Sequence, residues 1–264
     1  TESTSHIYVY EGGGYAALSG CSVALVPGKL GIMTPEDVAK AIRKGDGSLG
    51  HFPNGSLVCV ENTSNRGGGT CYPQETLDAI AKIAHDNDCA AHMDGARLFN
   101  AAIATSTDPA RIVRDYDSVS ICLSKGLGAP VGSVLVGSSD FISLAHRWRK
   151  MFGGGMRQAG VIAACGLYSI DNNIDRLSED HERAQRLAVA VNSISNFEVD
   201  LDSVQSNMVF ARTPEGTADK VVEHLASQGV DILTINDSVV RAVTHLHITD
   251  EDIEHAISAF SSMQ

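Results

Sequence analysis

Short apolar runs alternate with longer, more polar segments through the first half of the chain. Runs rich in β-branched and apolar residues and bounded by turn formers predict buried strands, at 21–26, 57–60, 90–93, 119–123 and 133–136. The segments between them predict helices, which open at Thr34 and span 73–87 and 96–104. Strands that alternate with helices form a mostly parallel sheet covered by helices on both faces. This half of the chain therefore predicts an α/β fold.

Helices dominate the middle of the chain, at 139–151, 157–171 and 174–195. A smaller α+β unit follows, with predicted strands at 208–211, 231–235 and 239–243 and predicted helices at 218–228 and 250–261. The helix at 174–195 alternates charged with apolar positions, which indicates a linking helix with one solvated face. We therefore expect a large domain over residues 1–173, and a linking helix with a small C-terminal α+β domain over residues 174–264.

Two polar residues stand at the ends of predicted strands. Lys125 follows the run 119–123 and precedes a glycine-rich segment. An amine held partly out of water there is nucleophilic enough to form an imine, but a lysine that simply reaches solvent fits equally well. Asp94 ends the run 90–93, at the sheet edge where α/β folds bind ligands, although aspartate is also a good helix N-cap. Pyridoxal phosphate (PLP) needs both groups, a lysine for its aldehyde and an acid that keeps its ring nitrogen protonated.

A series of motifs runs in order along nearly the whole chain. The segments are Ser5–Ile7 with Tyr10–Gly14, His51–Pro53, Val60–Thr63, His92–Arg97, Leu123–Pro130, Gly132–Ser133, Arg147–Lys150, Gly153–Gln158, Val240–Arg241 and Thr244–His245. Together they resemble the low-specificity L-threonine aldolases, in the β-eliminating lyase group of fold-type-I PLP enzymes. The resemblance implies a fold-type-I, transferase-like architecture and the cleavage of L-threonine or L-allo-threonine to glycine and acetaldehyde.

The resemblance also implies which residues hold the cofactor. It assigns the imine to Lys125, the ring nitrogen to Asp94, and a stacking and catalytic position on the ring to His6. It assigns the phosphate to Ser124, Lys150 and Arg157. Lys150 and Arg157 could reach it from a neighbouring subunit. For the last two, a solvated helix end is the alternative interpretation.

Two arginines are candidates for binding the substrate carboxylate. Arg241 stands inside the apolar run 239–243, where a guanidinium needs an anionic partner because it cannot lose its charge. The resemblance implies that this partner is the carboxylate of an amino-acid substrate. Arg97, three residues after Asp94, is assigned either to that carboxylate or to the phenolic oxygen of PLP. A salt bridge at the start of a helix is the alternative for Arg97.

One motif departs from the common family form. Ser64 occupies a position where many family members have a histidine close to the β-hydroxyl of the substrate. A serine can bind that hydroxyl through hydrogen bonds, but it is not a base near neutral pH. Water, His6 or another group must then accept the proton.

Composition and charge exclude some kinds of binding partner for this protein. The net charge of −12 argues against a nucleic-acid surface, and no apolar run is long enough to span a membrane. Six cysteines lack metal-type spacing, which suggests reduced thiols in a cytoplasmic protein, and His245 with His247 lacks a third metal ligand. The expected partners are a small amino-acid substrate and further copies of the chain, in a dimer or a tetramer.

The position of the first motif raises an alternative. In the family a Gly-Thr turn that binds the cofactor phosphate precedes this motif, whereas here the sequence starts five residues before His6. We therefore expect a large domain that is incomplete at its N-terminus, with weak PLP binding, little activity and a tendency to associate. A catalytically impaired homologue that acts as a non-catalytic or partner-dependent subunit, or a different PLP-dependent amino-acid lyase, remains open.

Overall fold

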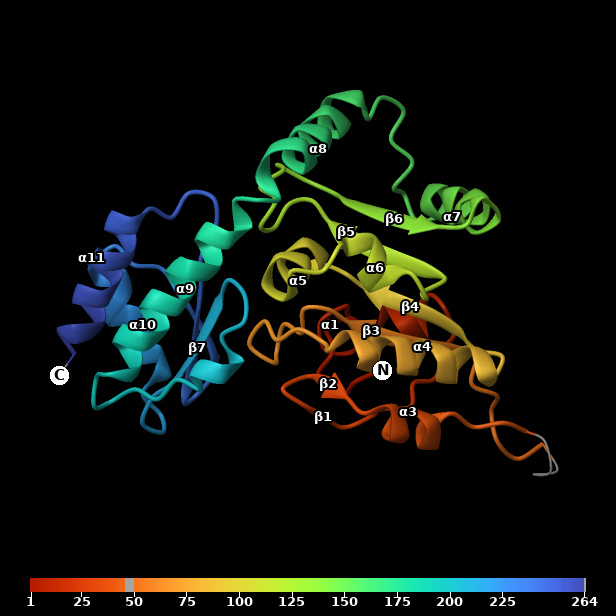
Figure 1. The fold of residues 1–264 in the computed structure, drawn as a ribbon, viewed down its shortest axis with the longest axis horizontal. Helices are drawn as coiled ribbons and strands as arrows, with labels where there is room; N and C mark the ends of the chain where they lie inside the picture. The colour runs from red at the N-terminus through yellow and green to blue at the C-terminus, as the bar shows by residue number, and fades with distance from the viewer. Residues whose placement is uncertain (46–49, 264) are drawn as a thin grey trace.

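A four-stranded sheet in the order β3-β4-β5-β6 lies at the centre of the larger part of the molecule (Figure 1). The computed structural model describes residues 1–45 and 50–263. Strands β3 (Leu57–Glu61), β4 (Ala90–Asp94) and β5 (Ser118–Cys122) run parallel, and β6 (Ser133–Gly137) is antiparallel to β5. The predicted α/β fold with a mostly parallel sheet is confirmed.

Helices pack against this sheet where the apolar pattern predicts them. Helix α4 (Gln74–Asp86) turns Leu77 and Ile80 inward, and both are almost fully buried. Helix α3 (Pro35–Ala41) begins as expected, because the hydroxyl of Thr34 accepts a hydrogen bond from Asp37 N and Pro35 occupies the first turn. The remaining elements here are α1 (His6–Val9), α2 (Gly14–Ala17), β1 (Gly28–Lys29), β2 (Ile32–Met33), α5 (Leu98–Thr105) and α6 (Pro109–Val113). We call the buried cluster that runs from Val26 to Val119 the first core.

The strand predicted at 21–26 is wrong. This segment makes a single parallel bridge, between Val26 and Glu2, and most of its residues are exposed. A strand is stable only when a neighbour pairs with its backbone groups, and apolar composition does not guarantee such a neighbour.

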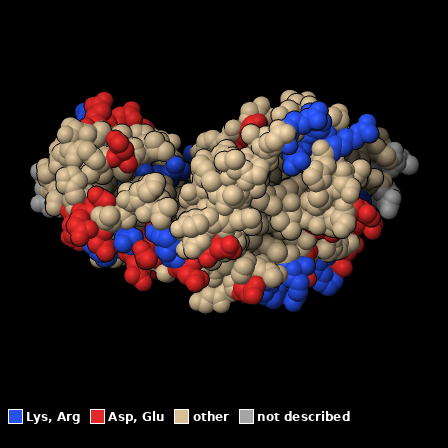
Figure 2. All heavy atoms as spheres, turned by 90° about the horizontal axis from the view of Figure 1, so that it is seen from above, with Lys and Arg blue, Asp and Glu red and all other residues tan. Residues whose placement is uncertain are grey.

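The last strand of the central sheet and the two helices after it leave a large apolar area uncovered. All five residues of β6 are exposed, and α7 (Ser139–Met151) and α8 (Gly160–Asn173) bury few side chains. Figure 2 views the molecule from this side and shows a broad area without charged side chains. We call this area the β6–α7–α8 surface; its exposed apolar residues include Leu135, Phe141, Leu144, Trp148, Phe152, Val161 and Leu167. No helix in the described part of the chain is both long and apolar enough to cross a membrane.

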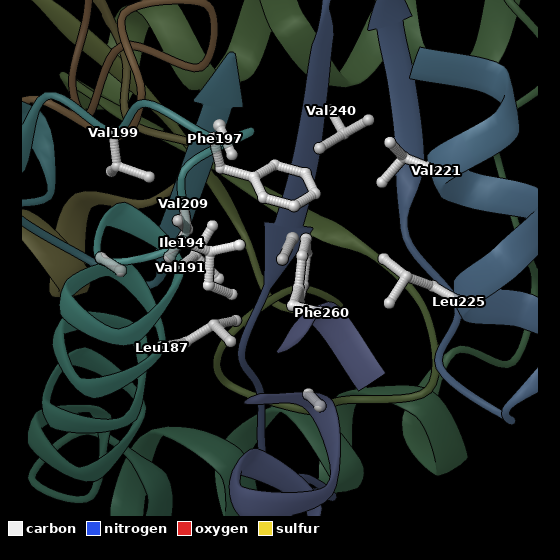
Figure 3. Close-up of a cluster of buried hydrophobic side chains, with 14 of the residues drawn as sticks. Leu187, Val191, Ile194, Phe197, Val199, Val209, Val221, Leu225, Val240 and Phe260 are labelled. Atoms are coloured by element: carbon white, nitrogen blue, oxygen red, sulfur yellow. The ribbon is translucent and has the colours of Figure 1, made fainter. Parts of the chain in front are cut away.

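A second core lies beside the first (Figure 1). Its sheet has the antiparallel order β7-β9-β8, from β7 (Met208–Arg212), β8 (Leu233–Asn236) and β9 (Val239–Val243). Helices α9 (Leu177–Asn192), α10 (Ala218–Ser227) and α11 (Asp250–Ser261) pack on it, with a short 3₁₀ turn, η1, at Leu201–Ser203. Figure 3 shows the cluster that they bury, in which the rings of Phe197 and Phe260 meet edge to face with centroids 5.2 Å apart.

Candidate active site

Parallel pairing brings the ends of three strands to one edge of the central sheet. Glu61 at the end of β3 pairs with Asp94 at the end of β4, and Asp94 pairs with Ser120 of β5. Lys125 follows shortly after β5 on the same side. The predicted meeting of the Asp94 and Lys125 segments at a common sheet edge therefore occurs in the structure.

Asp94 is buried and is held by its own turn. Its Oδ1 accepts a hydrogen bond from Ala96 N at 3.0 Å, and its side chain is 9% exposed. Helix α5 starts only at Leu98, with Arg97 in the capping position, so Asp94 does not cap that helix. Among the described residues, no cationic side chain lies within ion-pair distance of the Asp94 carboxylate. Within the described residues the negative charge of this buried acid is therefore left without an ion-pair partner, which is costly unless another cation binds there.

Two guanidinium groups with buried nitrogen atoms lie near this edge. Arg97 and Arg241 each have a buried Nε that finds no hydrogen-bond acceptor in the described part of the chain. Burial is the main cause that lowers the pKa of Arg97 to about 10, and the nearby positive charge of Arg241 adds to it. Burial also lowers the pKa of Arg241. Both groups still carry their charge near neutral pH, so the pair forms a site that favours an anion.

His6 belongs to the same edge through its backbone. Its N–H donates to Oε2 of the buried Glu61 at 2.5 Å. The imidazole Nδ1 lies 2.8 Å from Oε1 of Glu11, and the ring lies against that of Tyr10 with centroids 4.9 Å apart. The side chain of His6 is 36% exposed. The ring is therefore oriented by neighbours and remains accessible.

The structure does not gather every predicted residue at this edge. Lys125 and Ser124 are both exposed. The exposure of Lys125 also fits the alternative in which this lysine simply reaches solvent. Lys150 and Arg157 are exposed too, and α7, which carries Lys150, lies at the far end of β6 from the turn that leads out of β5 (Figure 1). Contact with a phosphate, from this or a neighbouring copy, stays a prediction for these side chains.

Ser64 lies inside a tight loop. It is 2% exposed, and its Oγ accepts a hydrogen bond from Gly67 N at 3.2 Å. Its backbone pairs with that of Thr70 across the loop. Ser64 Oγ thus already accepts one hydrogen bond within the loop, and its contact with a substrate hydroxyl stays a prediction.

Sequence reasoning missed one residue at this site. Nη1 of Arg241 donates to Oδ1 of Asn65 at 3.2 Å, across a separation of 176 residues. Asn65 belongs to the segment that contains Ser64, but nothing in the local sequence indicates a contact with β9. A single asparagine in a loop is otherwise typical of turn chemistry.

The chain is similar to known proteins in both sequence and fold. Residues 1–214 match the family described as β-eliminating lyase. The chain belongs to the β-eliminating lyase family. It is 40% identical over 259 residues to low-specificity L-threonine aldolase 1 of Arabidopsis thaliana, covering 97% of this chain and 72% of that protein. It is 39% identical over 251 residues to the low specificity L-threonine aldolase of Escherichia coli strain K12, covering 94% of this chain and 72% of that protein.

Solved structures support the fold of this lyase-family chain. The threonine aldolase of Leishmania major superposes with a TM-score of 0.80 at 20% identity, covering 100% of this chain and 76% of that chain. A serine palmitoyltransferase of Sphingomonas wittichii superposes with a TM-score of 0.64 at 17% identity, covering 87% of this chain and 58% of that chain. At these identities the likeness concerns the fold alone, and it agrees with the predicted fold-type-I architecture.

Proposed function

We propose that this protein is a PLP-dependent aldolase that cleaves L-threonine or L-allo-threonine to glycine and acetaldehyde. The observation that carries the proposal is the Arg97–Arg241 pair, two guanidiniums whose Nε atoms find no acceptor among the described residues, together with the buried carboxylate of Asp94 near Arg97. The carboxylate of an amino acid would pair with the two guanidiniums, and a protonated cofactor ring would pair with Asp94. The names of relatives about 40% identical along nearly the whole chain support the same reaction.

The residues at the sheet edge fit PLP in charge and chemistry. Lys125 supplies a free amine for the cofactor aldehyde, Asp94 an acid for the ring nitrogen, and His6 a flat accessible ring. We assign the phosphate to Ser124 of the same chain and to Lys150 and Arg157, which lie away from this edge and would reach it from a neighbouring copy. When bound, PLP supplies an electron sink for the electron pair released as the Cα–Cβ bond of the substrate breaks.

The side chains of this protein would then orient the substrate and move its protons. Arg241, with Arg97, binds the carboxylate and so fixes which bond of Cα faces the electron sink. His6 accepts the proton of the β-hydroxyl, directly or through water. Glu11 beside Nδ1 favours the tautomer in which Nδ1 carries the hydrogen and Nε2 is free to accept. Asp94 would hold a proton on the ring nitrogen of bound PLP by its negative charge.

The reaction assay tests this function. Purified protein supplied with PLP is incubated with L-threonine and L-allo-threonine, and acetaldehyde and glycine are measured together. Equal amounts of the two products are expected from at least one substrate. PLP-loaded protein that forms no acetaldehyde, or that releases ammonia and a keto acid instead, would contradict the aldolase assignment and indicate another lyase.

We expect Arg241→Lys to weaken substrate binding while the cofactor remains bound. Lysine keeps the positive charge but loses the planar fork that pairs with both oxygens of a carboxylate. The KM for threonine should rise about 10-fold, from the loss of one charge-assisted hydrogen bond. Steady-state kinetics with the PLP absorbance spectrum measures both effects. An unchanged KM would assign the substrate carboxylate to other residues.

We also propose that the protein acts as a homo-oligomer in a reducing compartment such as the cytoplasm. The exposed apolar residues of the β6–α7–α8 surface support association, because monomeric proteins rarely leave large apolar areas in water. The six cysteines are all free, which agrees with a reducing compartment.

A further inference from the structure

The side chain of Arg241 has one hydrogen-bond partner within the described residues. That partner is Oδ1 of Asn65, 3.2 Å from Nη1. No carboxylate of the described residues lies within ion-pair distance of this guanidinium. Its Nε is buried and lacks an acceptor. The amide oxygen of Asn65 therefore orients the group on one side and leaves its charge uncompensated.

Asn65 is itself held by a buried carboxylate. Its backbone N–H donates to Oε1 of Glu61 at 2.7 Å, and the second oxygen of Glu61 accepts from His6 N. Glu61 is only 4% exposed. Burial raises the pKa of Glu61, while the hydrogen bonds from the backbone of Asn65 and His6 favour its charged form. One carboxylate thus fixes two segments of the site.

The loop that carries Asn65 is packed closely against its surroundings. A Cβ at Gly67 would lie 2.0 Å from the backbone oxygen of Leu30, and a Cβ at Gly69 would lie 2.2 Å from Oγ of Ser206. Ser206 Oγ donates to the carbonyl oxygen of Gly69 at 2.9 Å. Because Ser206 lies just before β7, these contacts hold the loop against the second core, next to the sheet that carries Arg241.

We propose that Asn65, anchored by Glu61, is the positioning residue that aims the Arg241 guanidinium at the substrate carboxylate. The inference rests on the proposed function, in which Arg241 binds that carboxylate. By accepting from Nη1, Asn65 fixes the guanidinium plane, while Nε and Nη2 keep no partner among the described residues and could pair with both oxygens of a carboxylate once substrate binding opens this edge. A neutral acceptor suits this task, because an acidic residue would neutralise Arg241 and compete with the substrate.

Two substitutions separate this role from simple loop packing. In the PLP-loaded protein, Asn65→Ala should weaken the binding of glycine, measured by isothermal titration calorimetry, about 10-fold and raise the KM for threonine similarly. The kcat should change far less. Asn65→Asp should weaken glycine binding further than Asn65→Ala, because its carboxylate would occupy Arg241. A packing role predicts the opposite order, since aspartate has nearly the shape of asparagine.

Controls tie the effect to Arg241 and to the carboxylate. Asn87→Ala removes a similar amide at the end of α4, which donates to the carbonyl oxygen of Ile83, and should leave glycine binding unchanged. Affinity for ethanolamine, which lacks a carboxylate, should be the same in wild type and in Asn65→Ala. In the Arg241→Lys background, Asn65→Ala should add little to the KM, because the fork that it orients is already gone.

The outcomes distinguish this inference from the proposed function. Wild-type protein that cleaves threonine while both Asn65 variants bind glycine as tightly as wild type would overturn the role of Asn65 alone. Equal losses from Asn65→Ala in the wild-type protein and in the Arg241→Lys background would overturn it too. Wild-type protein that binds glycine but does not cleave threonine would contradict the aldolase function and leave the carboxylate site intact.

Discussion

Replacing Lys125 with alanine should lower the kcat for threonine cleavage by several orders of magnitude. Lys125 is the exposed amine that follows β5 at the sheet edge, and under the proposed function its loss would remove the covalent attachment of the cofactor and a group that could transfer protons close to it. The fold should survive, because the side chain makes no hydrogen bond or ion pair with the described residues. The PLP absorbance after dialysis should fall together with the activity.

A second lysine provides the matched control for this change. Lys82 is also exposed, and within the described part of the chain its one ion pair is with Asp86 of α4. Lys82→Ala should keep both the cofactor and the full rate. Near-native cleavage by Lys125→Ala would remove this lysine from the mechanism and favour the view that it merely reaches solvent.

Replacing Asp94 with asparagine should lower the kcat by about 10²- to 10³-fold, the range typical for loss of one buried electrostatic contact to the reacting system. The amide keeps the size of the side chain and can still accept the hydrogen bond from Ala96 N. It cannot hold a proton on a cofactor ring nitrogen by charge, so the electron sink is weakened while PLP still binds. Stopped-flow or steady-state rates with a PLP titration would separate the two effects.

Asp86→Asn is the control for the Asp94 change. Asp86 is an exposed carboxylate at the end of α4, and its loss should leave the rate unchanged. If Asp94→Asn matched wild type as well, the carboxylate of Asp94 would serve only the turn into α5.

The sequence alone predicted those helices that begin at a capping residue. The helix predicted at 250–261 begins where Thr249 and Asp252 form a capping box, and the helix predicted at 139–151 begins where Ser138 caps its first turn. The segment 21–26 has a comparable apolar pattern but, among the described residues, makes one isolated bridge and no strand pairing, because pairing is a property of the whole fold. Boundaries set by caps were therefore predictable, and a strand that depends on a distant neighbour was not.

The same distinction applies to the candidate site, where some features could be predicted from the sequence and others could not. Asp94 and the strand before Lys125 could be placed at one edge from sequence, because consecutive parallel strands end on the same side. Pattern alone could not reveal that Asn65 contacts Arg241, since that contact joins a loop after β3 to a strand of the second core and depends on how the two cores pack. Equally, no local signal indicated that the hydroxyl of Ser64 would turn into its own loop.

The division of the two arginines between the cores has a thermodynamic consequence. Arg97 precedes a helix of the first core and Arg241 lies in a strand of the second, and the positive charge of Arg241 lowers the pKa of Arg97 where the cores meet. An amino acid bound between them would replace that repulsion with attraction to both sides. At 100 times its dissociation constant, a ligand specific for the folded state adds about 2.7 kcal/mol to stability. A bound amino acid would thus link the first core to the second. A protein saturated with substrate would then unfold as a more cooperative unit than the free protein.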